Sequence, residues 1–172
     1  MILTGEEISN QVSMQRIKIS PFNREQITTN SYDIRLDDTL IRYTSDVIDP
    51  KIQPEYEEIK IPETGLILEP QSFHLGASFE KIGSDFYVPI LHAKSGTARK
   101  GLFVHVTSDL IDIGSYGKLT LQLYATLPVK VYPNMLIGQV TFWKPEGNIK
   151  LYHGKYQGSE KPRISEIYKD FK

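Results

Sequence analysis

Apolar and polar residues alternate with period two along much of this chain. The alternation covers residues 17–19, 32–36, 59–61, 119–124, 129–132 and 140–143. Side chains that alternate in this way are typical of strands with one face toward a core and the other toward solvent. Ten prolines interrupt the pattern, and no helical pattern longer than a few turns survives between them. Many short strands separated by turn signals predict an all-β sandwich or closed barrel.

One helix is predicted at the N-terminal end. Thr4 and Glu7 have the spacing of a capping box, in which each side chain binds the backbone N–H of the other residue. We expect a short helix that ends at about Val12.

Two segments depart from the strand pattern. Residues 46–58 are rich in Pro and acidic residues, which favours either a surface excursion between strands or a linker between two small subdomains. Residues 144–172 have few apolar side chains and contain Gly147, Gly154 and Gly158. We expect them to form an extended arm that becomes ordered on a ligand or a neighbouring subunit.

Length and composition limit the possible functions. With 172 residues the chain fits one domain, residues 1–172, and 20 basic against 21 acidic residues leave no global field to recruit nucleic acid or membrane. The absence of cysteine excludes disulfides, thiolate catalysis and the zinc site of the zinc deaminases. No segment reaches the roughly 18 apolar residues of a membrane span, and no secretory signal is present. We therefore expect a soluble protein of the cytoplasm, or of the host cytoplasm if the source is viral.

The segment 94–100 is a candidate anion-binding loop. Lys94, Ser95 and Gly96 place a cation, a hydroxyl and a flexible backbone in succession, and a helical turn at 97–100 would point free amides at an anion. Arg99 adds a bidentate phosphate donor. A plain β-turn with a solvated lysine explains the same residues.

Two further polar residues are candidates for chemistry. Asp112, before Gly114 and Gly117, fits a hairpin at a strand edge, where it would bind a sugar hydroxyl, orient a water, or serve only as a turn residue. Gln122 faces away from Leu121 and Leu123, so its amide meets either solvent or a ligand. The four histidines lack metal-ligand spacing, and serine hydrolase, Rossmann and P-loop motifs are absent.

Several of these blocks, in the same order and spacing, resemble the dCTP deaminase branch of the dCTP deaminase/dUTPase superfamily. They are residues 1–3, 31–36, 94–117, 119–123, 133–139 and 154–158, the last of which looks like the closing arm of bifunctional members. The resemblance covers almost the whole chain. It implies a distorted β-barrel or jelly-roll of the dUTPase type with a short N-terminal helix, assembled as a homotrimer with sites between subunits.

The resemblance also implies which residues hold the phosphates. Ser95 is the phosphate-binding serine, Arg99 reaches a triphosphate from the neighbouring subunit, and Gln139 matches a phosphate-contacting glutamine. Lys94 stands where the family has arginine, and Gly96 replaces a second serine.

The base and sugar contacts follow in the same way. Val106, Thr107 and Ser108 lie where backbone groups read the pyrimidine edge, and Asp112 matches the deoxyribose-binding aspartate. Ser115 replaces an expected aromatic residue in the sugar pocket.

The resemblance assigns the remaining contacts to the arm and to a metal. Tyr152, Lys155 and Tyr156 belong to the arm, 144–172, that closes over the nucleotide. Mg²⁺ is bound through the triphosphate and has no direct protein ligand.

Gln122 decides the predicted activity. Family deaminases have a glutamate there that activates water and transfers a proton to ammonia, whereas an amide cannot take up a proton. We therefore predict a hydrolase that converts a pyrimidine deoxynucleoside triphosphate, dUTP above all, to dUMP and pyrophosphate with Mg²⁺, using Asp112 and Gln122.

Two alternatives stay open, and a third class ranks last. The first is a dCTP deaminase, which makes dUTP and ammonia, with an engineered Glu-to-Gln change. The second is a nucleotide binder without catalysis. The third, a structural β-barrel, has no use for the ordered site residues.

Overall fold

The computed structural model describes residues 1–171 and is mostly β-structure, as predicted. Its helical elements are α1 (Gly5–Ser13), η1 (Arg24–Gln26), α2 (Ser95–Ala98) and η2 (Ile167–Phe171). Its strands are β1 (Ile17–Ser20), β2 (Tyr32–Arg35), β3 (Thr39–Tyr43), β4 (Tyr56–Lys60), β5 (Leu66–Leu68), β6 (Phe73–Ser84), β7 (Val88–Ala93), β8 (Leu102–Phe103), β9 (Tyr116–Ala125), β10 (Val129–Val131) and β11 (Leu136–Trp143). None of the helices in this range has the length and apolar character that a membrane crossing needs.

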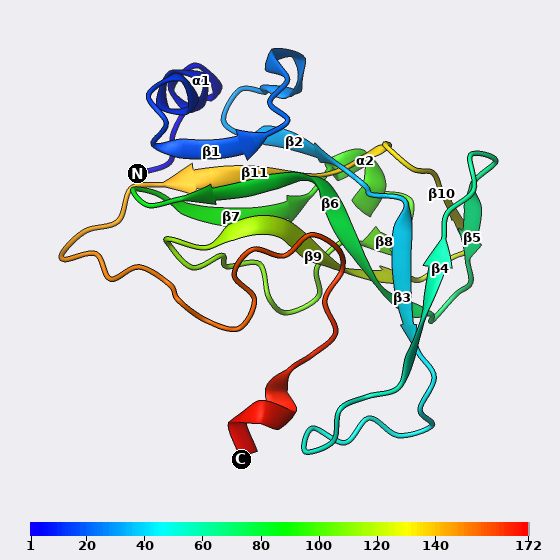
Figure 1. The fold of residues 1–172 in the computed structure, drawn as a ribbon. Coiled ribbons are helices and arrows are strands. Elements are labelled where there is room, and N and C mark those ends of the chain that lie inside the picture. The colour runs from blue at the N-terminus through cyan, green and yellow to red at the C-terminus, as the bar shows by residue number, and fades with distance from the viewer. Residues whose placement is uncertain (172) are drawn as a thin grey trace.

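The strands form three sheets (Figure 1). The largest has the order β4-β3-β6-β9-β8, with β1 also paired to β6, and the second has the order β2-β11-β7. The two-stranded sheet β10-β5 lies at the right-hand end of the view in Figure 1, opposite α1. The 12-residue strand β6 pairs with β1, β3 and β9 and therefore links much of the molecule.

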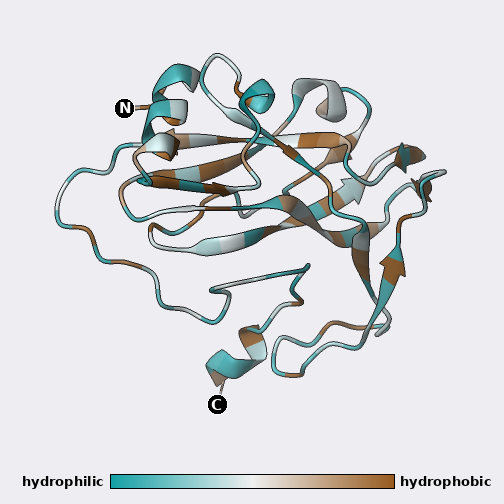
Figure 2. Ribbon diagram, turned by 45° about the horizontal axis from the view of Figure 1, so that its top comes forward, coloured by the Kyte–Doolittle hydropathy of each residue, from teal (hydrophilic) through white to brown (hydrophobic). Residues whose placement is uncertain are grey.

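One hydrophobic core joins the sheets. Fully buried side chains come from β2 (Tyr32), β5 (Leu68), β6 (Ile82), β9 (Leu121) and β11 (Phe142), and they belong to a single cluster. Figure 2 shows the same arrangement, with hydrophobic segments concentrated on the strands and hydrophilic colours along α1 and much of the arm. In β9 and β10 the period-two alternation is the cause, because it gives the strand one apolar face that is stabilised by burial, whereas β2, β6 and β11 are buried on consecutive residues.

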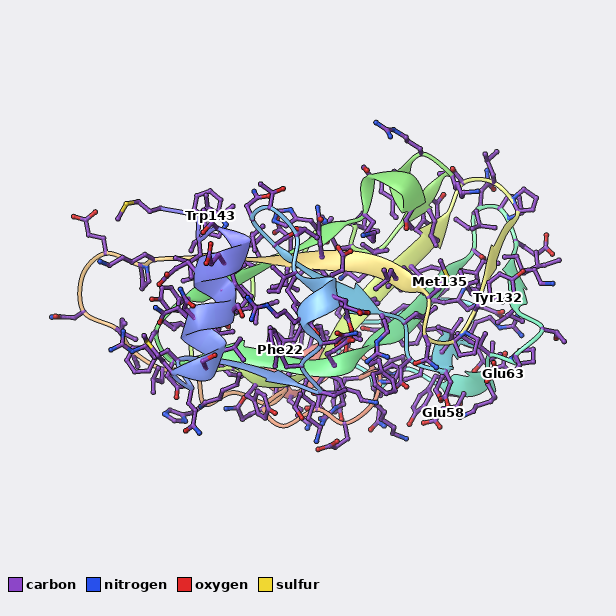
Figure 3. The ribbon with its side chains drawn as sticks, turned by 90° about the horizontal axis from the view of Figure 1, so that it is seen from above. Phe22, Glu58, Glu63, Tyr132, Met135 and Trp143 are labelled. Atoms are coloured by element: carbon purple, nitrogen blue, oxygen red, sulfur yellow. The ribbon has the colours of Figure 1, made fainter. Side chains whose placement is uncertain are left out.

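Helix α1 confirms the predicted helix and half of its capping box. The Thr4 hydroxyl accepts a hydrogen bond from the Glu7 N–H at 3.4 Å. The Glu7 carboxylate instead accepts from the amides of Asn10 and Gln11, at 3.4 and 2.6 Å. A Cβ on Gly5 would lie 1.8 Å from the Thr28 carbonyl oxygen, so this position needs glycine. Viewed from above, α1 lies across the end of β11 that is marked by Trp143, and Met135 marks the other end (Figure 3).

Residues 46–58 form a surface excursion and not a linker between subdomains. They lie in the hairpin of β3 and β4, whose register runs from the pair Thr39 and Lys60 to the pair Tyr43 and Tyr56. Both strands belong to the same sheet, so the excursion connects neighbouring parts of one domain.

The C-terminal segment passes beneath β9 in Figure 1, in orange to red. Three backbone hydrogen bonds tie it to the chain before and within β9. Tyr152 N–H donates to the Ile113 carbonyl at 2.8 Å, Gly158 N–H to Tyr116 at 2.9 Å, and Lys118 N–H to Ser159 at 2.8 Å. These bonds place the arm against β9 of the same chain; its ordering on a ligand or a neighbouring subunit stays a prediction.

Candidate functional site

A cavity of about 570 Å³ lies between β9, the loop before it and the C-terminal arm. Its lining is Tyr43, Phe73, Leu75, Leu91, Ser108, Asp109, Leu110, Ile111, Asp112, Ser115, Lys118, Leu119, Thr120, Gln122, Tyr152, Tyr156, Ser159, Arg163, Ile164 and Ser165. Five of these residues were predicted as site residues from the sequence: Ser108, Asp112, Gln122, Tyr152 and Tyr156. The cavity therefore unites three segments that are separate in the sequence.

Strand β9 supplies the floor of the cavity. Leu121 and Leu123 are fully buried in the core, and the intervening Gln122 lines the cavity. Thr120 and Lys118 share that face because side chains two residues apart point the same way. Pairing with β6, where Leu75 lies opposite Gln122, fixes the position of the strand.

The Gln122 amide has a defined orientation. Its Oε1 accepts hydrogen bonds from the backbone N–H groups of Val106 and Thr107, at 3.0 and 3.3 Å. The Gln122 N–H donates to the Val104 carbonyl at 2.9 Å, which holds the same loop. Only oxygen can accept these bonds, so Nε2 is the other end of the amide. Within residues 1–171 Nε2 has no hydrogen-bond partner. The Gln122 side chain lines the cavity, where a ligand could reach it.

Asp112 lies at the cavity in a turn that leads into β9. The Ser115 N–H donates to the Asp112 carbonyl at 3.0 Å, and Gly114 has a φ of +90°. The predicted hairpin is wrong, because the residues before Asp112 are held by β7 at the isolated bridge between Ile90 and Leu110. The Asp112 side chain is exposed and has no hydrogen-bond partner in the described chain, which leaves its carboxylate open to the cavity.

The arm covers the cavity with tyrosines and one arginine. The Tyr152 hydroxyl accepts from Tyr156 N–H at 3.2 Å, and the Tyr156 hydroxyl accepts from Glu166 N–H at 2.9 Å. Tyr43 on β3 holds the far end, because its hydroxyl accepts from Ser165 N–H at 3.0 Å. Burial raises the pKa of Tyr43, so this hydroxyl stays protonated.

Ion pairs inside the arm keep its last turn in place. The Glu166 carboxylate binds Lys169 at 2.6 Å and Arg163 at 2.5 Å, and hydrogen bonds from these two cations lower its pKa. Lys155 binds Asp170 at 2.7 Å, and that hydrogen bond raises the pKa of the lysine. Lys155 was predicted to bind the nucleotide as part of the arm, and here its ammonium group is bound to Asp170 within the arm.

The predicted anion loop lies outside this cavity. Lys94 precedes α2, Ser95 and Gly96 begin it, and Arg99 follows it; the last three are exposed. Ala98 N–H makes the first bond of the turn, to the Lys94 carbonyl at 2.9 Å, so the earlier amides are not used within the helix. The turn begins two residues earlier than predicted.

The strands β2 and β11 lie beside Lys94, and β2 holds its side chain in place. Its ammonium group pairs with the carboxylate of Asp33 on β2, which is 6% exposed. The neighbouring Gln139 on β11 lies opposite Asp33, and its Oε1 accepts from the Ser31 hydroxyl at 3.1 Å. Lys94, Ser95, Gly96, Arg99 and Gln139 thus form a group of predicted residues apart from the cavity.

Residues 2–145 match the family model described as dCTP deaminase-like. The chain belongs to the dCTP deaminase-like family. A relative in Clostridium botulinum (strain Eklund 17B / Type B), named "dCTP deaminase, dUMP-forming", is 42% identical over 172 residues, with 99% of each chain covered. Relatives of the same name in Hathewaya histolytica and Leptospira biflexa are 39% and 38% identical; the alignments cover 99% of this chain in both cases, and 99% and 98% of the relatives.

A solved structure confirms the fold expected for a member of this family. The crystal structure of 2'-deoxycytidine 5'-triphosphate deaminase from Agrobacterium tumefaciens matches with a TM-score of 0.65 and 21% identity. The match covers 82% of this chain and 47% of that one.

Several cavity residues of this family member were not predicted from the sequence. Thr120 and Lys118 share the strand face of Gln122, so the period-two pattern would have indicated them. No comparable signal marks Arg163 or Ser159, because the arm has no periodicity that indicates which side faces β9. Residues 1–171 contain no group of three or more His, Asp or Glu side chains arranged for a metal ion.

Proposed function

We propose that this dCTP deaminase-like protein forms dUMP by hydrolysing dUTP to dUMP and pyrophosphate. One observation carries the proposal: the cavity holds an open carboxylate, Asp112, and an amide, Gln122, at the position where deamination needs a proton-transferring carboxylate. Phosphate hydrolysis can use the Asp112 carboxylate, whereas deamination cannot use the Gln122 amide as a general base.

Deamination requires a side chain beside the pyrimidine ring that can take up and release a proton. Water adds to the ring carbon that bears the amino group, and ammonia leaves after a side chain has moved a proton to it. The Gln122 amide is neutral, and its oxygen is already bonded to two backbone N–H groups. Since a positioned general base contributes about 10²–10⁴-fold, we expect dCTP deamination to be lost or very slow.

Hydrolysis needs a water aimed at phosphorus. In the proposed reaction, water attacks the phosphorus next to the sugar, the bond to the bridging oxygen breaks, and pyrophosphate leaves. The Asp112 carboxylate orients the water and accepts its proton. Arg163 and Lys118 at the cavity add positive charge beside the phosphates, although each is also bound to a carboxylate at 2.5 Å, Arg163 to Glu166 and Lys118 to Asp37.

We propose Mg²⁺ as the cofactor, carried by the triphosphate. The described residues 1–171 offer no carboxylate cluster, and single carboxylates fit a cation that retains waters and phosphate oxygens as ligands. When bound, the ion neutralises charge that builds up on the phosphate oxygens.

The two groups of predicted residues support a site built by two subunits. Lys94, Ser95, Arg99 and Gln139 lie apart from the cavity, whereas Asp112 faces it. In the homotrimer that we propose, the exposed amides and cations around α2 of one subunit approach the phosphates of a nucleotide bound by its neighbour. The arm, from residue 144 onward, closes over that nucleotide.

The test is product analysis by chromatography, with purified protein, Mg²⁺ and dUTP, for the wild type, Asp112→Asn and Asp46→Asn. We expect dUMP and pyrophosphate from the wild type, a loss of about 10²–10⁴-fold in Asp112→Asn, and no loss in Asp46→Asn, an exposed residue that does not line the cavity. Intact dUTP after long incubation, with dUTP bound, would instead make the protein a nucleotide binder.

A second candidate function rests on the names of the curated relatives. Conversion of dCTP itself to dUMP would need a proton-transferring carboxylate at position 122. Ammonia release from dCTP by the wild-type protein would favour this candidate over dUTP hydrolysis alone.

A further inference from the structure

We infer that the Gln122 amide selects nucleotides whose pyrimidine carries a carbonyl oxygen at ring position 4 and disfavours those with an amino group there. The inference rests on the proposed function, which places the base against this part of β9. It adds a role for Gln122 in choosing the substrate, beyond the missing proton transfer.

The loop before β9 fixes which end of the amide meets the ligand. Oε1 accepts from two backbone N–H groups, those of Val106 and Thr107. Rotating the amide by half a turn would break both bonds and set its NH₂ group against two donors. Nε2, a donor without a partner in the described chain, is therefore the group that faces the cavity.

A fixed donor distinguishes the two natural bases. The oxygen at position 4 of uracil accepts a hydrogen bond from Nε2. The amino group of cytosine is itself a donor, so the two groups meet without a bond and both lose hydration. An unpaired buried donor weakens binding substantially, and we expect about a 10-fold or larger preference for the carbonyl.

A carboxylate at the same position would reverse the preference. In Gln122→Glu one oxygen can keep both bonds to the loop, because these need only an acceptor. The other oxygen replaces Nε2 and accepts from the cytosine amino group. The change alters one donor to an acceptor and leaves the size of the side chain almost unchanged.

The experiment is calorimetric binding of three α,β-imido deoxynucleoside triphosphates with Mg²⁺, which resist cleavage between the first two phosphates. The bases are uracil, cytosine and 2-pyrimidinone. Cytosine and 2-pyrimidinone share the same ring nitrogen acceptor and differ only in the amino group at position 4, so their ratio isolates that contact. Ammonia is measured in each Gln122→Glu sample so that only intact cytosine ligand is counted.

We expect wild-type protein to bind the uracil nucleotide best and the cytosine nucleotide more weakly than the 2-pyrimidinone nucleotide. In Gln122→Glu the cytosine nucleotide should become the tighter of the last two. If the wild type and Gln122→Glu each bind the cytosine and 2-pyrimidinone nucleotides equally, the inference is overturned, even if dUTP is hydrolysed. Failure to bind any of the three overturns the proposed function and the inference with it.

Discussion

The floor and the cover of the cavity are built by different kinds of interaction. The floor, strand β9, is paired with β6 and β8, and its core face buries Leu121 and Leu123 completely. The cover, the arm from residue 144, has no strand and is held by a few backbone bonds, tyrosine hydroxyls and ion pairs. Strand pairing and burial on both sides of Gln122 therefore fix its position. Tyr156 and Arg163 belong to the more weakly held arm, so we expect them to move with it.

Energetics support this division. Leaving the floor would expose apolar side chains, and removing one buried leucine side chain typically costs about 2–5 kcal/mol. The ion pairs that join the arm to the rest of the chain, Lys81 with Glu160 and Lys161 with Glu58, reach solvent. Such pairs contribute about 0–1 kcal/mol each, so the arm opens at much lower cost than the floor unfolds. In the proposed function, a nucleotide therefore enters by displacing the arm and leaves the position of Gln122 unchanged.

The largest effect is expected from a change in the floor. Gln122→Glu should raise the rate of ammonia release from dCTP by about 10²–10⁴-fold, because it restores a general base beside the ring. A coupled ammonia assay measures the gain. Gln53→Glu, at an exposed position that does not line the cavity, is the matched control and should release no more ammonia than the wild type. A Gln122→Glu protein that binds dCTP but stays inactive would show that the floor is incomplete in another way.

A smaller effect is expected where floor and cover meet. A Cβ on Gly117 of β9 would lie 2.6 Å from the Ser159 nitrogen and 3.0 Å from its oxygen, which are backbone atoms of the arm. Gly117→Ala should therefore push the arm away. A loss of about 1–2 kcal/mol would raise the open population about 5- to 30-fold. Trypsin cleavage after Lys155 or Arg163 measures the opening.

Thermal unfolding provides the control for Gly117→Ala. A melting temperature close to that of the wild type, with faster arm cleavage, places the effect in the arm. Unchanged cleavage would contradict the close packing of arm and floor.

The smallest effect concerns the ion pairs of the cover. Lys169 and Arg163 hold the pKa of Glu166 below its ordinary value. The stabilisation is fully present above about pH 4.3, the usual glutamate pKa, and is lost as the pH falls through the lower folded value. Hydrogen exchange of the arm, corrected for the intrinsic rate, should therefore rise on the acid side of that pH.

Glu166→Gln should loosen the last turn of the arm already at neutral pH and remove the added acid sensitivity. Glu63→Gln is the matched control, since Glu63 is exposed at the far end of the molecule (Figure 3). Equal acid sensitivity in all three proteins would contradict the role of Glu166.

The contrast between floor and cover also explains what the sequence predicted. The alternation of Leu121, Gln122 and Leu123 was enough to separate core from cavity, and Thr4 was enough to start α1. These predictions succeed because both signals depend only on neighbouring residues: side chains of a strand alternate between its two faces, and an N-cap residue binds the first turn of its own helix.

Other contacts were beyond prediction because they join distant segments. Ser165 N–H meets the hydroxyl of Tyr43, 122 residues away, and Lys94 pairs with Asp33, 61 residues away. No period or spacing shows which polar side chains the fold brings together. The family resemblance supplied roles for Lys94 and Lys155, but not the carboxylates that hold them in this chain.

The central claim is that this chain retains phosphate hydrolysis and lacks deamination. One measurement tests both parts: mass spectrometry of the products after incubation of dUTP and, separately, dCTP with Mg²⁺ in ¹⁸O-labelled water. The account predicts dUMP from dUTP with one label in its phosphate group, and no labelled base from dCTP. Label in a uracil base formed from dCTP, or unlabelled and uncleaved dUTP, would contradict it.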